Sequence, residues 1–301
     1  MPVQFHVLAS GSSGNACVID TGGFGVLIDF GLSPRQLAPR MNEAGVSWER
    51  IQAVVLTHTH TDHWQAATLT HLAKLGLPIY CHADHVEAFD RDSRAFAALS
   101  SAGLIRHYEP GKRLKLHADC RCLPIELEHD GTMTCGFRFE GAGDPWAIGY
   151  AADLGCWTPA LAKHFADVDL LALEFNHDVA LQLQSGRHPF LIRRVLSDQG
   201  HLSNAQAADM LAEVLRISEP GRLRHLVQLH LSQQCNRPEL AESAARQALE
   251  RHGVELPIHT TDQKKAAPVI DLSRLPTAAP RRRRIASKVA NCVQPMLPFA
   301  P

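Results

Sequence analysis

The sequence predicts an α/β domain over residues 1–263, followed by a tail of different character over residues 264–301. Short runs rich in β-branched and aromatic residues alternate with stretches of helical periodicity as far as about residue 263. Beyond that point the chain is rich in Ala, Pro and Arg, and we expect it to be flexible and disordered. With 45% hydrophobic and 20% charged residues, the 301-residue chain has the composition of a globular protein.

The predicted strands are short, apolar and bounded by turn residues. Glycine turns at 11–15 and 22–23 separate the first three of them. In chain order, we expect strands at residues 5–10, 16–21, 25–30, 53–57, 78–81, 123–127, 134–139, 147–151, 170–175, 226–229 and 256–259.

Helices are expected between these strands. Ser33 and Pro34 suit the cap and first turn of a helix that Gly45 closes. Asn204 is expected to cap a helix that continues through Leu215 with apolar residues at helical spacing. Two more helices are predicted at residues 64–76 and 238–252.

The formal net charge of −1 is the sum of two unlike parts. Residues 264–301 contain eight Lys+Arg and one Asp, which gives +7 and leaves −8 on the rest of the chain. The near-neutral total therefore does not exclude a nucleic-acid partner. No run approaches the roughly 18 apolar residues of a spanning helix, and no Lys or Arg precedes Arg35 as in a secretory signal. We expect a cytoplasmic protein with reduced cysteines.

A dense group of metal-binding side chains leaves the end of the strand predicted at 53–57: His58, His60, Asp62 and His63. Imidazole and carboxylate groups are the ligands that zinc and similar divalent metals bind. Residues two apart lie on one side of an extended segment, so His58 and His60 can reach one ion. After a turn, Asp62 and His63 can reach a second ion. The alternative, a polar surface turn with incidental histidines, fits this spacing poorly.

Other candidate ligands follow other predicted strands, namely His129, Asp153 and His230. Polar residues at strand ends gather at one edge of an α/β sheet, where such folds carry their sites. Asp29 also ends a strand and is a candidate to orient a ligand histidine. Any one of these residues alone fits a surface position, but their joint placement favours a metal centre.

In this order, these residues resemble the motif set of the metallo-β-lactamase superfamily, over about residues 3–263. The set comprises Asp29, His58, His60, Asp62, His63, His129, Asp153 and His230. The chain also resembles the YycJ/WalJ-like branch, whose members are regarded as metal-dependent DNA exonucleases. That closer similarity rests on residues 9–15, 129–130, 174–178, 200–204 and 230–232.

The resemblance implies a four-layer αββα metallo-β-lactamase sandwich with two divalent ions, Zn²⁺ or Mn²⁺, at one edge. It implies His58, His60 and His129 on one ion, Asp62, His63 and His230 on the other, and Asp153 between them. It further implies a hydrolase of phosphodiester bonds, a DNA exonuclease acting from a 5′ end in repair or replication. The alternative is a small-molecule hydrolase of the same fold, acting on a cyclic phosphodiester, thioester or lactone. The complete ligand set disfavours a non-enzymatic adaptor.

Catalytic roles are expected for three residues. Asp62 can orient an attacking hydroxide as well as bind metal. His201 and His177 are candidates to protonate the leaving oxygen, and the alternative for both is a buried, hydrogen-bonded histidine. Glu174 is either a support behind a ligand or a substrate contact.

The loop at residues 10–15 is rich in Gly and Ser. Its backbone N–H groups, with Ser13 and Asn15, are candidates to contact a substrate phosphate. The alternative is a hairpin turn in which the glycines supply positive φ.

The tail suggests two kinds of partner. Four consecutive Arg at residues 281–284 are either a solvated charge run or additional phosphate contacts for DNA. The segment at 294–299 resembles the short C-terminal motif by which bacterial repair enzymes dock on the replicative sliding clamp, through Gln294, Leu297 and Phe299. Pro295 and Pro298 depart from that motif. Apolar anchors on a polar arm suit a peptide that binds in a groove, and the alternative is a chain end that binds no partner.

Overall fold

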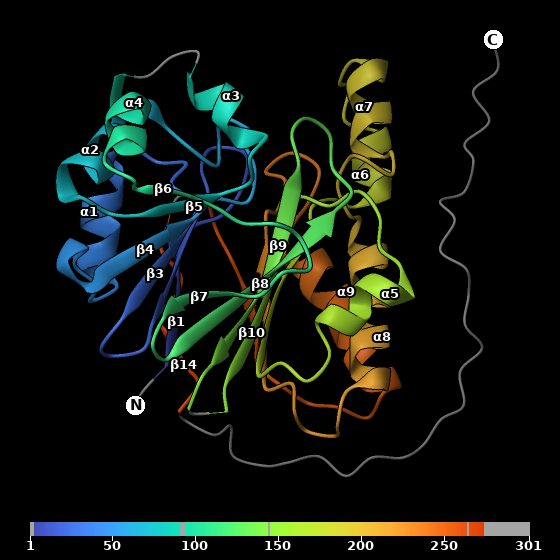
Figure 1. Ribbon diagram of the computed structural model, residues 1–301. Coiled ribbons are helices and arrows are strands. Elements are labelled where there is room, and N and C mark those ends of the chain that lie inside the picture. Colours follow the sequence, from blue (N-terminus) through green and yellow to red (C-terminus); the bar gives the residue numbers. More distant parts are fainter. Residues whose placement is uncertain (1–2, 91–93, 144, 264, 274–301) are drawn as a thin grey trace.

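The computed structural model describes residues 3–90, 94–143, 145–263 and 265–273. Two seven-stranded sheets lie face to face, with helices on both outer sides, as Figure 1 shows. The strand order is β14-β1-β2-β3-β4-β5-β6 in the first sheet and β13-β12-β11-β10-β9-β8-β7 in the second. The predicted four-layer αββα sandwich is therefore confirmed.

The first sheet begins as an antiparallel meander through β1, β2 and β3 and continues with β4, β5 and β6 parallel to β3. Its strands are β1 (Gln4–Ala9), β2 (Ala16–Asp20), β3 (Gly25–Ile28), β4 (Ile51–Val55), β5 (Ile79–Cys81), β6 (Ile105–His107) and β14 (Ile270–Asp271). Its helices are α1 (Pro34–Glu43), α2 (Ala66–Leu75), α3 (His85–Asp90) and α4 (Arg94–Ser101), with a 3-10 turn at Trp48–Arg50.

The second sheet is antiparallel from β7 to β10 and parallel from β10 to β13. Its strands are β7 (Leu114–His117), β8 (Cys120–Leu127), β9 (Thr134–Gly141), β10 (Ala147–Ala151), β11 (Leu170–Glu174), β12 (His225–Leu229) and β13 (Ile258–Thr260). Its helices are α5 (Pro159–His164), α6 (Val179–Leu183), α7 (Pro189–Val195), α8 (Asn204–Ile217) and α9 (Pro238–Arg251).

Side-chain alternation along the strands builds the layers. In β11, Leu170 and Ala172 belong to the core between the two sheets, whereas Leu171 and Leu173 pack with the helices outside the second sheet. All four side chains are buried, as expected for a parallel strand that is covered on both faces. Such a strand reads as a continuous apolar run, which explains why the sequence predicts it correctly.

The N-cap of helix α8 lies one residue earlier than predicted. Ser203, not Asn204, is the N-cap, and its hydroxyl accepts a hydrogen bond from N of Gln206 while the side chain of Gln206 accepts one from N of Ser203. This reciprocal pair is a capping box. Asn204 instead hydrogen-bonds the side chain of Asn236.

The expected flexible tail needs a correction at its start. Residues 265–273 return to the first sheet, where β14 pairs antiparallel with β1 and N of Ala267 donates to the carbonyl of Val7. A two-residue strand has no periodicity that the sequence could reveal. The Arg run at 281–284 and the predicted clamp contacts of Gln294, Leu297 and Phe299 lie outside the described residues.

The parallel strands of both sheets end at the edge where the candidate ligands lie. Ile28 and Val55 are in register at the ends of β3 and β4, and Glu174 and Leu229 are in register at the ends of β11 and β12. The sheets are joined there by a hydrogen bond from N of Cys135 to the carbonyl of Thr57. Residues that follow these strands therefore meet in one place.

Gly31 is required for the chain to pass this edge. A Cβ on Gly31 would lie 1.7 Å from the carbonyl oxygen of Asp62 and 2.8 Å from N of Asn15. We expect Gly31→Ala to displace the segment around Asp62, to lower the free energy of unfolding by about 1–3 kcal/mol and to weaken metal binding. Denaturant unfolding and metal titration measure these effects.

Gly23→Ala is the matched control, because a Cβ on Gly23 would meet nothing within 4 Å. It is expected to change the free energy of unfolding by less than about 0.5 kcal/mol. Equal stability and metal affinity in the two variants would show that the close approach at Gly31 is unimportant.

Candidate metal centre

Backbone strain marks the edge where the strands end. Asp29, Asp153 and His230 have φ of 60°, 58° and 55°, and they are three of the four described non-glycine residues with positive φ. Such residues are uncommon, cost on the order of 1 kcal/mol each and cluster at functional sites. Asp29 and His230 directly follow β3 and β12, and Asp153 lies two residues beyond β10.

One group of possible ligands consists of His58, His60 and His129, whose nearest ring nitrogens lie within 4.8 Å of one another. Nε2 of His129 is 3.3 Å from Nδ1 of His60. Nδ1 of His129 lies 2.7 Å from the carbonyl oxygen of Gly200, so the ring proton lies on Nδ1 and is donated to this carbonyl. Nε2 of His129 then faces the other two histidines of the group. Nε2 of His58 is buried with no hydrogen-bond partner among the described residues.

A second group consists of Asp62, His63 and His230. Oδ2 of Asp62 lies 3.3 Å from Nε2 of His230 and 3.7 Å from Nε2 of His63. In both groups, side chains from distant parts of the sequence turn a nitrogen or oxygen toward a common point. This is the arrangement that a metal ion requires.

Asp153 connects the two groups. Its Oδ2 lies 2.7 Å from Nε2 of His63, and its Oδ1 lies 3.2 Å from Nδ1 of His230. His58, His63 and Asp153 also form a possible ligand group of their own. A carboxylate whose two oxygens lie close to ring nitrogens of separate histidines fits a ligand that shares an ion with those rings.

The electrostatics of the first ligand group suit cation binding. Burial lowers the pKa of His58 well below its ordinary value, and burial also lowers the pKa values of His60 and His129. These imidazoles are therefore neutral at pH 7, which is the form that binds metal. Burial acts to raise the pKa of Asp153, but the charges of His230 and His63 hold that pKa well below its ordinary value.

Asp29 supports His63 from behind. Its buried carboxylate accepts a hydrogen bond from N of Thr57 at 2.8 Å and lies 2.7 Å from Nδ1 of His63. Nδ1 of His63 is thereby held by Asp29, and its Nε2 faces Asp153 and Asp62. A contact of this kind fits Asp29 as a residue that orients a ligand histidine.

Glu174 is a support and not a substrate contact. It is fully buried, and its Oε1 lies 2.8 Å from Nδ1 of His201 and 3.1 Å from Nδ1 of His230. Its Oε2 accepts hydrogen bonds from the backbone N–H groups of Leu154 and Leu202. The carboxylate is thus occupied by protein donors on both oxygens.

The two candidate proton donors differ in position. The side chain of His201 is 19% exposed and lies beside Asp153, with 3.3 Å between Nδ1 and Oδ1. Burial acts to lower the pKa of His201, but Glu174 and Asp153 raise it to about 9. A divalent cation on Asp153 would act against that rise.

His177 does not fit the predicted role of proton donor. It is fully buried, neither ring nitrogen has a hydrogen-bond partner among the described residues, and burial lowers its pKa to about 4. A neutral, inaccessible ring cannot protonate a leaving group at neutral pH. This corrects the expectation for His177.

Asn15 also has a different role from the one predicted. It is buried, its Oδ1 accepts from N of Gly11, and its Nδ2 lies 3.3 Å from Oδ2 of Asp62. It therefore holds the turn at residues 11–15 against Asp62 and is not accessible to a phosphate. Ser13 is exposed in that turn, and a contact between Ser13 and substrate stays a prediction.

Comparison with known proteins identifies the family. A model described as the beta-lactamase superfamily domain matches residues 25–231. The chain belongs to this superfamily. It is 28% identical over 274 residues to the exodeoxyribonuclease WalJ of Streptococcus pneumoniae, which covers 89% of this chain and 98% of that protein. It is 27% identical over 276 residues to the exodeoxyribonuclease YycJ of Bacillus anthracis, which covers 88% and 97%.

Solved structures confirm the superfamily fold. The metallo-beta-lactamase fold protein YhfI from Bacillus subtilis has a TM-score of 0.64 at 16% identity, covering 90% of this chain and 100% of that one. Zn²⁺-bound PqqB from Methylobacterium extorquens has a TM-score of 0.61 at 16% identity, covering 87% and 99%. The predicted resemblance to the superfamily and to its YycJ/WalJ-like branch is confirmed. Together with the His/Asp groups, the superfamily fold indicates a site for divalent metal.

Sequence reasoning missed several supports of this superfamily site. Oγ1 of Thr57 lies 2.9 Å from Oδ2 of Asp29 and 3.0 Å from Nδ1 of His58. The hydroxyl of Ser10 accepts a hydrogen bond from N of His230, and Nδ2 of Asn176 donates to the carbonyl of His230. Ser10 and Asn176 lie within the segments that suggested the closer branch, and Thr57 directly precedes the His58–His63 motif, but only the folded structure shows what they contact.

The support behind His63 can be tested through metal affinity. Asp29→Asn keeps the shape of the side chain but replaces one acceptor oxygen by a donor, so it cannot accept from both Thr57 and His63 as the carboxylate does. We expect the affinity for Zn²⁺ or Mn²⁺ to fall by about 10- to 100-fold, as measured by isothermal titration calorimetry. Asp119→Asn, at a side chain that is 67% exposed, is the control. Unchanged affinity in Asp29→Asn would contradict the supporting role.

Proposed function

We propose that this protein is a metal-dependent phosphodiesterase that removes nucleotides from DNA, most specifically a 5′ exodeoxyribonuclease of DNA repair or replication in the cytoplasm. The observation that carries the proposal is the convergence of two ligand groups on one sheet edge, joined by Asp153. The similarity to two exodeoxyribonucleases along almost their whole length supports DNA as the substrate. Among the described residues, no helix is long and apolar enough to cross a membrane.

The same residues would form a dinuclear site. One cation would be held by His58, His60 and His129, the other by Asp62, His63 and His230, and Asp153 would be shared. When bound, divalent ions such as Zn²⁺ or Mn²⁺ activate water and stabilise negative charge on phosphoryl oxygens. Imidazole and carboxylate donors suit both metals.

Asp62 would direct the attacking water. Its side chain is 19% exposed, so water can reach it. Burial acts to raise the pKa of Asp62, but His63 and His230 lower it to about 2. The carboxylate is therefore ionised at neutral pH and can accept a hydrogen bond from the water molecule that attacks phosphorus.

His201 would return a proton to the leaving oxygen. It is the partly exposed histidine beside Asp153, and Glu174 holds its Nδ1. Nε2 is then the atom that can face substrate and donate the proton.

The nuclease proposal is tested on 5′-labelled single- and double-stranded DNA with Mn²⁺ or Zn²⁺. We expect the wild-type protein to release nucleotides from the 5′ end, and Asp62→Asn to lose more than about 100-fold in rate. Asp84→Asn, at a side chain that is 60% exposed, is the control and should cut normally. Equal cutting by wild type and Asp62→Asn would identify a contaminant, and cleavage of cyclic nucleotides alone would favour a small-molecule hydrolase.

The role of His201 predicts a dependence on the leaving group. We expect His201→Gln to lower kcat on DNA by about 10²- to 10⁴-fold, with metal content unchanged. The loss should be much smaller for bis(p-nitrophenyl) phosphate, because p-nitrophenolate leaves without a proton. His177→Gln tests the buried alternative and should not show this dependence. Equal losses on both substrates would make His201 a positioning residue instead of a proton donor.

A further inference from the structure

Helices α6 and α7 and the loop between them, residues 179–195, form an arm beside the metal centre. Figure 1 shows this α6–α7 arm beyond the end of the second sheet, above α8 and α9. Its last residues lead to Asp198 and Gly200, and the carbonyl of Gly200 contacts His129. The arm is therefore attached directly to the candidate site.

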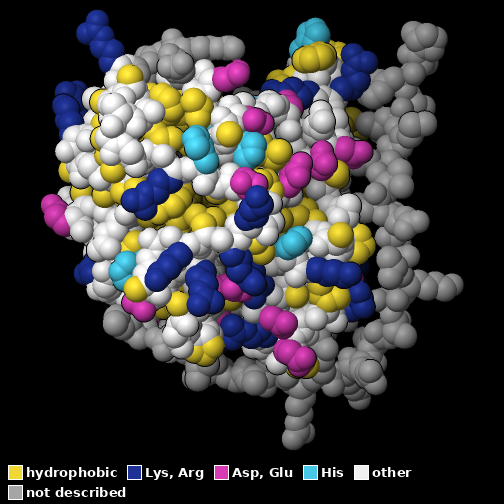
Figure 2. All heavy atoms as spheres, in the orientation of Figure 1, with side chains coloured by type: hydrophobic (Ala, Val, Ile, Leu, Met, Phe, Trp, Pro, Cys, Tyr) yellow, Lys and Arg dark blue, Asp and Glu magenta, His cyan; other side chains and the backbone are white. Residues whose placement is uncertain are grey.

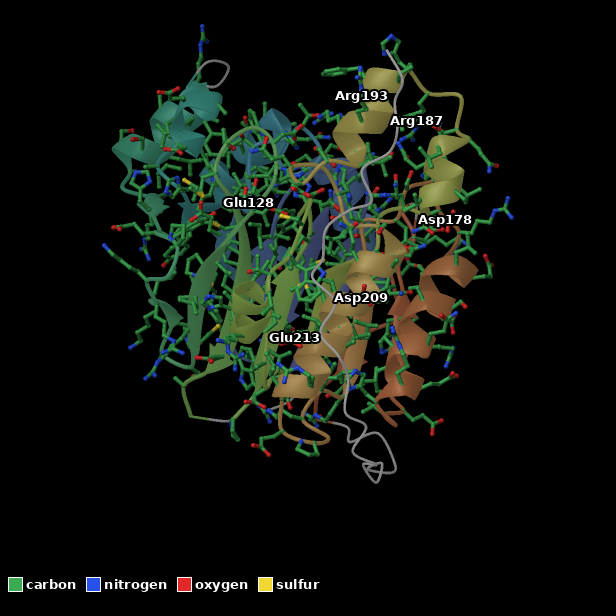
Figure 3. All side chains as sticks on the ribbon, turned by 90° about the vertical axis from the view of Figure 1, so that its right-hand side faces the viewer. Glu128, Asp178, Arg187, Arg193, Asp209 and Glu213 are labelled. Atoms are coloured by element: carbon green, nitrogen blue, oxygen red, sulfur yellow. The ribbon has the colours of Figure 1, made fainter. Side chains whose placement is uncertain are left out.

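The composition of the arm differs from that of the body. It contains Arg187, Arg193 and Arg194 and no Asp or Glu, whereas the chain up to residue 263 has a formal charge of −8. Figure 3 shows Arg187 and Arg193 on this upper part of the molecule. Basic and apolar side chains gather on the same projection in Figure 2.

The arm also exposes apolar surface. Val179, Leu183 and Phe190 are 39%, 40% and 66% exposed, and they are half of the large apolar side chains that are exposed in the described part of the chain. Phe190 is the most exposed of them. An aromatic ring presented to solvent among arginines, with no carboxylate on the same segment, is a feature of surfaces that bind single-stranded nucleic acid.

A short chain of contacts joins this surface to the metal centre. The Arg194 guanidinium pairs with Asp130 through Nε and Nη2, and Nη1 is not part of that pair. Oδ1 of Asp130 lies 3.4 Å from Nε2 of His60 and 3.6 Å from Nε2 of His129. Phe190 precedes Arg194 by four residues in α7 and therefore lies on the same face, about 6 Å farther from the site.

We propose that this face of the α6–α7 arm binds the single-stranded segment of DNA next to the phosphate that is cut. Phe190 stacks on a base, and Arg193 and Arg194 contact backbone phosphates. The inference rests on the proposed function, because it takes DNA as the substrate. The arm contacts DNA whether or not cleavage follows. The arm is continuous with the metal centre and carries positive charge. Both features favour DNA over a second copy of the chain as its partner.

Substitutions at Phe190 separate stacking from apolar contact. Binding of a fluorescein-labelled single-stranded 20-mer is measured by anisotropy in the Asp62→Asn background. Phe190→Ala and Phe190→Leu should each weaken binding by about tenfold, whereas Phe190→Trp should stay within about twofold of Phe190. Leu75→Ala, at an exposed apolar residue of α2, is the matched control and should bind normally.

The charge of the arm is tested by salt dependence. For a single strand, Arg193→Gln should reduce the slope of log Kd against log salt by about 0.7. Arg251→Gln, on α9, should leave the slope unchanged. An unchanged slope in Arg193→Gln would remove the phosphate contact from the proposal.

Activity measurements distinguish the two proposals. With the other residues wild type, Phe190→Ala should slow cleavage of the single strand by about tenfold and leave hydrolysis of bis(p-nitrophenyl) phosphate unchanged, since this small diester does not reach the arm. Normal DNA binding and cleavage by Phe190→Ala would overturn the arm proposal and leave the nuclease proposal intact. If DNA binding depends on Phe190 but the wild-type protein does not cleave DNA, the nuclease proposal would be overturned and the arm proposal would stand. A dimer seen by light scattering that Phe190→Ala dissociates and Phe190→Leu keeps, with DNA binding equal in all variants, would identify self-association instead.

Discussion

The buried carboxylate of Asp29 is the contact on which the geometry of the site depends. It sits at the end of β3 with a strained φ of 60° and ties the start of the His58–His63 segment to the neighbouring strand through Thr57. The same carboxylate holds Nδ1 of His63. One group thus fixes both the path of the backbone and the direction of a ring nitrogen. The remaining strand ends can then supply Asp153 and His230 to a position that is already defined.

The sequence could predict the parts of the fold and site that depend on local pattern. The apolar runs of β11 and β12, and the close spacing from His58 to His63, carry their signal within a few residues. The role of His177 depends on burial, and those of Asn15 and Glu174 depend on partners up to 56 positions away, so a linear pattern could not decide among their alternatives. Short elements such as β14 and α7 escaped prediction because a few residues show no period.

The acidic character of the body has a structural explanation in part. Asp29, Asp153 and Glu174 are carboxylates buried at the strand ends, where isolated charges would be strongly destabilising. Each lies against histidine nitrogens or backbone N–H groups. These buried carboxylates and imidazoles offset one another at the metal centre. The net charge of the chain therefore gives little information about the charge of the surface that a substrate meets. The basic α6–α7 arm shows how different that surface is.

The pairing of β14 with β1 helps the molecule to avoid self-association through strand pairing. Without residues 265–273, β1 would be an edge strand with unpaired N–H and C=O groups and largely buried, apolar neighbours. Such an edge is a template for strand addition between molecules and for aggregation. A two-residue strand is enough to cover part of it, with further hydrogen bonds from Ala267 and Leu272 on either side. Residues 265–273 thus protect the edge of the first sheet from pairing with another molecule.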